Sequence, residues 1–134
     1  MAVIDASVYV ALVNAHESEH SSSWAWFDQT LVAGEAIVAP LILLPEVAAA
    51  LSRGVGDPML AQRVVQQLAR SEVIELIPVT MALATRAAAI AADHRIRGCD
   101  AVYVALAGQL SDTLVTLDRQ QLERGAPLVE VRSP

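Results

Sequence analysis

Residues 2–15 read AVIDASVYVALVNA, and this stretch decides the fold. Residues 2–4 are apolar and rich in β-branched side chains, which is typical of a short buried strand. Asp5 interrupts the apolar run, and residues 6–15 then favour a helix. The stretch therefore predicts a strand that leads directly into a helix, with a carboxylate at the junction.

The same alternation of short apolar runs and longer periodic segments continues along the chain. Strands are predicted at residues 35–40, 73–79, 113–118 and 127–131, and helices at residues 21–34, 43–54, 57–71, 80–98 and 100–110. Strands that alternate with helices form a parallel sheet covered on both faces, with right-handed crossovers. We therefore expect an α/β fold, a three-layer α/β/α sandwich with a central parallel sheet of four to five strands, in one domain spanning residues 1–134.

Local signals set several helix ends in this prediction. Asp57 and Pro58 suit the N-cap and the first position of the helix that follows. Thr80 is expected to cap the next helix, and Gly98 to follow its last turn. A serine of the run at 21–23 is expected to cap the helix that starts there.

Composition narrows the class of protein. With 54% hydrophobic and 18% charged residues, the chain is too apolar to be disordered. The N-terminus lacks a basic region and indicates a first strand, and the apolar run at 36–45 contains two prolines and is too short to cross a bilayer. Cys99 is the single cysteine and is expected to be a small buried residue. Without disulfides, a reducing, cytoplasmic compartment is expected.

The charged residues exclude further classes. The formal net charge is −6, and all nine basic residues are arginines. Because there is no lysine, a Walker-type nucleotide site and Schiff-base chemistry are excluded. The segment DASVYV at 5–10 faintly resembles the aspartyl-phosphate motif of haloacid-dehalogenase-like phosphatases, but that chemistry also depends on a lysine.

Four acids are predicted at one edge of the sheet. Asp5 and Asp118 follow strands, Glu46 lies in the first turn of a helix after a strand, and Asp100 opens a helix. Ligands of such sheets bind outside the carboxyl ends of the strands. Alternatives stay open, because Asp100 equally suits a helix N-cap, Glu46 the positive end of a helix dipole, and Asp118 a turn.

Four carboxylates in one place need a cation or protons. Two unit charges about 5 Å apart repel by about 3 kcal/mol at an effective dielectric constant of about 20. Mg²⁺ or Mn²⁺ with oxygen ligands fits best, and a phosphodiester substrate follows, because Mg²⁺ also binds phosphate oxygens. Arg95 and Arg97 precede Asp100 and are candidates for phosphate contact, or alternatively for helix-end cations.

Four segments in order resemble the successive motifs of PIN-domain ribonucleases, and in particular the VapC-type toxins of bacterial toxin–antitoxin pairs. These are IDASVYVAL at 4–12, PEVAAAL at 45–51, RIRGCDAVYVALA at 95–107 and VTLD at 115–118. Each motif alone is weak, and the most specific part is the third. The resemblance extends over nearly the whole chain.

The resemblance implies an Mg²⁺-dependent endoribonuclease with Mn²⁺ as a substitute metal. It implies that metal-activated water hydrolyses RNA, leaving a 3′-hydroxyl and a 5′-phosphate. The implied catalytic and metal-binding residues are Asp5, Glu46, Asp100 and Asp118, with Ser7 and Thr116 orienting them. It also implies a homodimer and a small antitoxin that blocks the site. The alternative is a PIN-fold binding module without turnover.

Residues 16–20 read HESEH, which fits the zinc-protease pattern HExxH. A zinc site of that kind places both histidines on one face of a long helix. Here His16 and His20 fall between two predicted helices, so we interpret the segment as a polar loop beside the substrate groove.

The aromatic cluster Trp24, Trp26 and Phe27 is interpreted as core packing plus one exposed ring, with a partner-binding patch as the alternative.

Overall fold

The computed structural model describes residues 1–134, and their elements alternate as the sequence predicts. The strands are β1 (Ala2–Ile4), β2 (Ile37–Pro40), β3 (Ile74–Ile77), β4 (Thr113–Val115) and β5 (Val131–Arg132). The helices are α1 (Ala6–Val13), α2 (His20–Val32), α3 (Leu43–Gly54), α4 (Pro58–Ala69), α5 (Met81–His94), α6 (Gly98–Leu110) and α7 (Arg119–Gly125).

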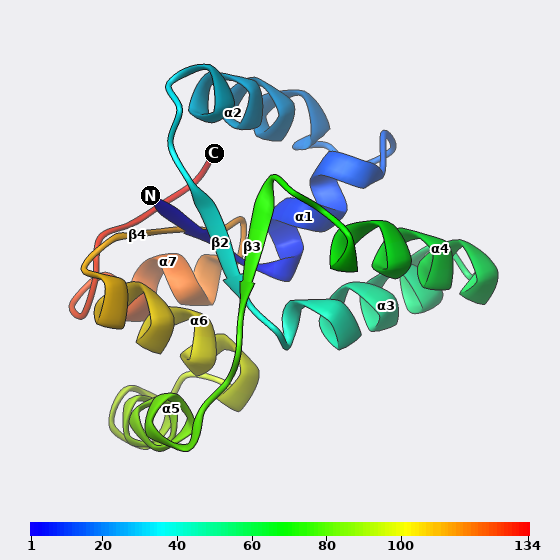
Figure 1. Ribbon diagram of the computed structural model, residues 1–134. Coiled ribbons are helices and arrows are strands. Elements are labelled where there is room, and N and C mark those ends of the chain that lie inside the picture. The colour runs from blue at the N-terminus through cyan, green and yellow to red at the C-terminus, as the bar shows by residue number, and fades with distance from the viewer.

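All five strands form one parallel sheet in the order β3-β2-β1-β4-β5. Figure 1 shows α1, α3 and α4 on one side of this sheet and α5, α6 and α7 on the other. The expected three-layer α/β/α sandwich with a parallel sheet is therefore confirmed. Because β1 lies in the centre, the residue that follows it emerges in the middle of the carboxyl edge.

The core lies between the sheet and its covering helices. Val3, Ile4 and Val38 of the central strands are almost completely buried. Helix α6 is buried around most of its circumference, from Ala101 to Ala107 apart from Val102, which is partly exposed. A helix that is apolar all round belongs inside a protein, so α6 holds its first turn rigidly against the sheet.

The end of the chain differs from the prediction. The strand expected over 113–118 ends at Val115, and the unpredicted helix α7 follows Asp118. Asp118 caps α7 by accepting a hydrogen bond from the backbone N–H of Gln121 at 3.0 Å. The final strand, expected at 127–131, is limited to the pair Val131–Arg132.

Three local expectations are wrong. Cys99 is exposed rather than buried, and it lies in the first turn of α6. Gly98 begins α6 instead of ending α5, whose last residue is followed by Arg95 in the left-handed conformation with φ 54°. Helix α2 begins at His20 after Glu19, with no serine side chain as its cap.

Other signals hold. Asp57 caps α4 through the N–H groups of Met59 and Leu60, with Pro58 at the helix start. Thr80 caps α5 through the N–H of Leu83. None of the helices combines the length and the apolar character needed to span a bilayer.

Candidate active site

The four predicted acids come together at the carboxyl edge of the sheet. Asp5 follows β1, Asp118 lies three residues after β4, and Glu46 and Asp100 lie in the first turns of α3 and α6. All four line one open cavity of about 420 Å³. The topology explains this convergence. All the strands are parallel, so the residues that follow them and the first turns of the helices that come next lie at the same edge of the sheet.

Four hydrogen-bond donors surround the carboxylate of Asp5, which is only 2% exposed. Its Oδ1 accepts from Ser7 Oγ at 2.5 Å and from Val8 N at 3.3 Å. Its Oδ2 accepts from Thr116 Oγ1 at 2.5 Å and from Gln121 Nε2 at 2.6 Å. Burial raises the pKa of Asp5, and the hydrogen bonds from Ser7, Thr116 and Val8 oppose this rise.

The two hydroxyl groups are themselves held by the backbone that follows β4. Leu117 N donates to Ser7 Oγ at 2.9 Å, and Asp118 N donates to Thr116 Oγ1 at 3.0 Å. Ser7 and Thr116 therefore connect the start of α1 to the segment carrying Asp118. Through them the orientation of Asp5 depends on both segments.

Arg97 joins two of the acids. Its Nε donates to Asp100 Oδ2 at 2.8 Å, and its Nη2 donates to Asp118 Oδ2 at 3.1 Å. The hydrogen bond to Asp100 raises the pKa of the Arg97 guanidinium. Burial raises the pKa of Asp100, and the hydrogen bond from Arg97 opposes that rise. Arg97 thus offsets part of the negative charge of the cluster.

Glu46 has no such partner. Its Oε1 is buried and makes no hydrogen bond, and the same is true of the hydroxyl of Tyr103, which lines the same cavity. Burial raises the pKa of Glu46, the nearby Tyr103 hydroxyl opposes this rise, and repulsion from Asp100 and Asp5 adds to it. Burial also raises the pKa of Tyr103, with Glu46 contributing. A buried carboxylate oxygen without a donor is one that a bound cation could satisfy.

Sequence reasoning missed Gln121. This residue of α7 is 1% exposed, and its Nε2 lies 2.6 Å from Asp5 Oδ2 and 3.4 Å from Asp100 Oδ1. No charge or motif in the sequence indicated it. Only the capping pattern of Asp118, which predicts a helix starting after it, could have placed Gln121 one turn on and beside the acids.

The side chains present suit a hard divalent cation. Four carboxylates supply the oxygen ligands that Mg²⁺ and Mn²⁺ prefer, and Glu46 Oε1 is buried without a donor. As the side chains lie, however, no three of the acidic, histidine and cysteine groups are close enough together to coordinate one ion. The acids therefore need a shift of side chains before they can share a metal.

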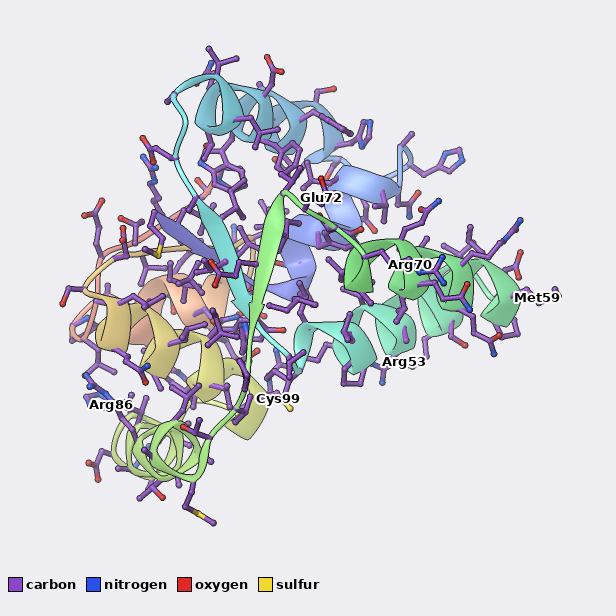
Figure 2. All side chains as sticks on the ribbon, in the orientation of Figure 1. Arg53, Met59, Arg70, Glu72, Arg86 and Cys99 are labelled. Atoms are coloured by element: carbon purple, nitrogen blue, oxygen red, sulfur yellow. The ribbon has the colours of Figure 1, made fainter.

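The two predicted arginines have different positions. Arg97 lines the cavity, whereas Arg95 lies outside it and its carbonyl oxygen accepts a hydrogen bond from Arg124. A basic residue that the sequence did not single out, Arg53 on α3, lines the cavity as well. Figure 2 shows Arg53 on α3 and Cys99 at the start of α6. Both residues also line a neighbouring hollow, which Glu46 and Arg97 share.

The HESEH segment lies at the rim of the cavity, where Glu17 and Glu19 contribute to its lining. Its two histidines do not share a helix, because α2 begins at His20 and His16 precedes it. The Nδ1 of His20 lies 2.7 Å from the carbonyl oxygen of Ala11. The expectation of a polar loop is therefore confirmed for residues 16–19, which border the cavity, whereas His20 already belongs to α2.

The aromatic cluster follows the core-packing interpretation. Trp26 is buried at 9% exposure and Phe27 is partly buried, whereas Trp24 is 46% exposed. Trp24 donates a hydrogen bond from its indole nitrogen to the carbonyl oxygen of Leu12 at 2.9 Å and packs edge-to-face on Phe27. One ring of the three is therefore largely exposed.

The sequence from residue 2 to residue 126 matches the PIN domain family. This chain therefore belongs to the PIN domain family. No curated protein sequence matches it.

Solved structures share the fold along nearly their whole length. VapC20 of Mycobacterium tuberculosis, described as a sarcin-ricin loop cleaving toxin, has a TM-score of 0.77 and 22% identity, covering 98% of this chain and 99% of its own. VapBC2 of Rickettsia felis, bound to a promoter DNA fragment, has a TM-score of 0.75 and 15% identity, covering 99% and 98%. FitAcB of Neisseria gonorrhoeae has a TM-score of 0.68 and 20% identity, covering 100% and 98%. At these identities the likeness shows the fold.

Proposed function

We propose that this protein is a metal-dependent endoribonuclease that acts as the toxin of a type II toxin–antitoxin pair, with residues 1–134 as one PIN-like domain. The observation that carries the proposal is the convergence of Asp5, Glu46, Asp100 and Asp118 on one cavity at the carboxyl edge of the sheet. Membership of the PIN domain family supports it.

The four acids are the proposed ligands of Mg²⁺ or Mn²⁺. When bound, such an ion activates water, stabilises charge on the leaving oxygen and orients the phosphodiester. Ser7 and Thr116 hold Asp5 in a fixed orientation, since each hydroxyl donates to one of its oxygens and accepts a backbone N–H. Tyr103, whose buried hydroxyl lies near Glu46, would help to orient that carboxylate as a ligand.

Arginines at the cavity provide the contacts with RNA. Arg53 makes no contact with an acid, and its Nε reaches only the carbonyl oxygen of Ala49 at 3.3 Å in its own helix. Its guanidinium is thus available to a phosphate that flanks the scissile bond. The neighbouring hollow shared by Arg53, Arg97 and Cys99 extends the groove, so we place one flank of the RNA strand there.

An antitoxin and a second copy of the chain are the proposed protein partners. Similar folds occur in a toxin–antitoxin complex from Klebsiella pneumoniae and in FitAB bound to a DNA fragment. Co-expression with the product of the neighbouring gene should yield a stable complex that cleaves no RNA. Light scattering of the purified toxin should give the mass of a dimer.

A second candidate function is a binding module without turnover. Arg97 and Gln121 already donate to three of the four acids, so the cluster is partly satisfied without metal. Turnover separates the two functions, because a binding module retains RNA or antitoxin and leaves RNA intact.

Incubation of the purified protein with total cellular RNA, with and without Mg²⁺ or Mn²⁺, tests the proposal. We expect discrete cuts with new 5′-phosphate ends that require metal and are missing from an Asp5→Asn variant. Sequencing of those ends identifies the target RNA. Intact RNA at every metal concentration, from folded protein free of antitoxin, would support the binding module instead.

A further inference from the structure

The hydrogen bonds around Asp5 leave no free position on its carboxylate. A carboxylate offers about four lone-pair positions, and Asp5 accepts from Ser7, Val8, Thr116 and Gln121. A metal ion can therefore bind Asp5 only if one of these four donors gives up its position. The donor that moves most easily is the one with the fewest other hydrogen bonds.

Three of the donors are anchored. Val8 N belongs to the backbone of α1, where its position follows from the helix. Ser7 Oγ and Thr116 Oγ1 each accept a backbone N–H, from Leu117 at 2.9 Å and from Asp118 at 3.0 Å. Moving either hydroxyl breaks a second hydrogen bond in a buried place, which is costly.

Gln121 is the fourth donor and the least anchored. Its side chain makes hydrogen bonds only through Nε2, because the buried Oε1 has no hydrogen-bond partner. The second contact of Nε2, with Asp100 Oδ1, is long at 3.4 Å. The unpartnered carbonyl means that rotation of this amide loses no hydrogen bond at Oε1.

The Nε2 of Gln121 also contacts two of the proposed metal ligands at once. It contacts Asp5 Oδ2 and Asp100 Oδ1, which come from different elements. As the side chains lie, no three acids are close enough together to hold one ion. The amide N–H groups of Gln121 stabilise the two buried carboxylates, although less than the charge of a cation would.

We propose that Gln121 holds the place of the metal ion in the metal-free protein and is displaced from the Asp5–Asp100 pair when the ion binds. Gln121 is thus a positioning residue that competes with the metal and sets its affinity. This inference rests on the proposed metal-dependent function. It adds to that function a step in which the amide of α7 leaves the two carboxylates.

Calorimetric titration of Mn²⁺ into metal-free protein tests this inference without any cleavage assay. Gln121→Met keeps about the same side-chain length, with a flexible thioether that can move aside but cannot donate to the carboxylates. We expect this variant to bind Mn²⁺ about tenfold more tightly than the wild type, because the competing hydrogen bonds are gone. Gln120→Met, the same change at the exposed neighbouring glutamine, should leave the affinity unchanged.

The sign of the effect separates the inference from simple structural damage, which weakens metal binding. Unchanged or weaker Mn²⁺ binding by Gln121→Met would overturn it and would make Gln121 a supporting residue or a ligand. If Gln121→Met does not fold, Gln121→Asn, whose shorter amide is drawn back from both acids, must show the same gain. A wild-type protein that binds no Mn²⁺ would overturn this inference together with the metal-dependent function.

Discussion

Thr116 Oγ1 lies 2.5 Å from Asp5 Oδ2, although 111 residues separate the two in the chain. The pairing follows from the parallel register of β1 and β4, which brings Ile4 opposite Val115. The residues directly after the two strands therefore face each other at the carboxyl edge. This contact links the first and last acidic segments of the candidate site.

Replacement of Thr116 by valine should weaken both the fold and the site. The change keeps the shape but removes the donor to Asp5 and leaves the partly buried N–H of Asp118 without an acceptor. We expect the free energy of unfolding to fall by about 1–3 kcal/mol. Denaturant unfolding measures the loss, and Thr116→Ser, which keeps the hydroxyl, is the control. Equal stability of the valine and serine variants would contradict this account of the contact.

The sequence predicts the acids better than the groups that surround them. Asp5 and Glu46 follow apolar strands at the positions where parallel sheets collect ligands, so their convergence was predictable. Helix α7 was missed because RQQLERG contains a single large apolar residue, Leu122, and gives no helical period. The place of Gln121 follows from α7, since an amide carries no charge signal of its own.

Arg97 shows a second limit of the sequence. Its position just before Asp100 predicted a basic group at the site, and the cavity lining contains it. Its bonds to both Asp100 and Asp118 depend on how the start of α6 faces the end of β4, which no local pattern records. Cys99 was wrongly expected in the core: α6 becomes buried only from Asp100 onward, and Cys99 lies before that point.

The free energy of unfolding of the metal-free protein should fall as pH rises above the ordinary pKa values of its carboxyl groups. Burial raises the pKa of Asp5, Glu46 and Asp100 above 3.8, 4.5 and 3.8, respectively. At a pH between the ordinary pKa of each group and its raised pKa in the folded state, the folded protein still holds a proton that the unfolded chain has released. The contribution of these three groups to stability is therefore present below the ordinary values and is lost as pH rises.

The comparison of wild type with Glu46→Gln isolates one such group. Unfolding of both proteins in chelator across a pH series should show the wild type losing stability relative to the variant as pH rises above 4.5, the ordinary value for this group. If the stability of the wild type instead rises relative to that of the variant above pH 4.5, the raised pKa of Glu46 is contradicted. Saturating Mg²⁺ should reverse the trend for the wild type.

The histidines of HESEH should be dispensable for activity. A double replacement of His16 and His20 by alanine removes the contact of His20 with Ala11 and should cost about 1 kcal/mol of stability. Metal-dependent RNA cleavage should remain within about twofold of wild type, measured at saturating RNA. Loss of activity together with loss of bound zinc would contradict the interpretation of this segment as a polar loop.

Arg53 should contribute one phosphate contact to RNA binding. In an Asp5→Asn background, which prevents cleavage, Arg53→Gln should weaken single-stranded RNA binding and reduce the slope of log K against log salt by about 0.7. Arg63→Gln, at an exposed position on α4 that does not line the cavity, is the matched control. Equal slopes for the two variants would remove Arg53 from the proposed path of the strand.

The most direct test of the account is the rate of Mg²⁺-dependent RNA cleavage by Glu46→Gln beside that of Glu72→Gln. The two variants lose the same charge, one in the cavity and one at an exposed position before β3. We expect Glu46→Gln to lose at least about a hundredfold in rate, because the loss of a residue that only orients a metal ligand already costs about 10–100-fold, and Glu72→Gln to cleave like the wild type. Equal cleavage by both variants, or none by the folded wild type, would contradict a metal-dependent nuclease built on these four acids.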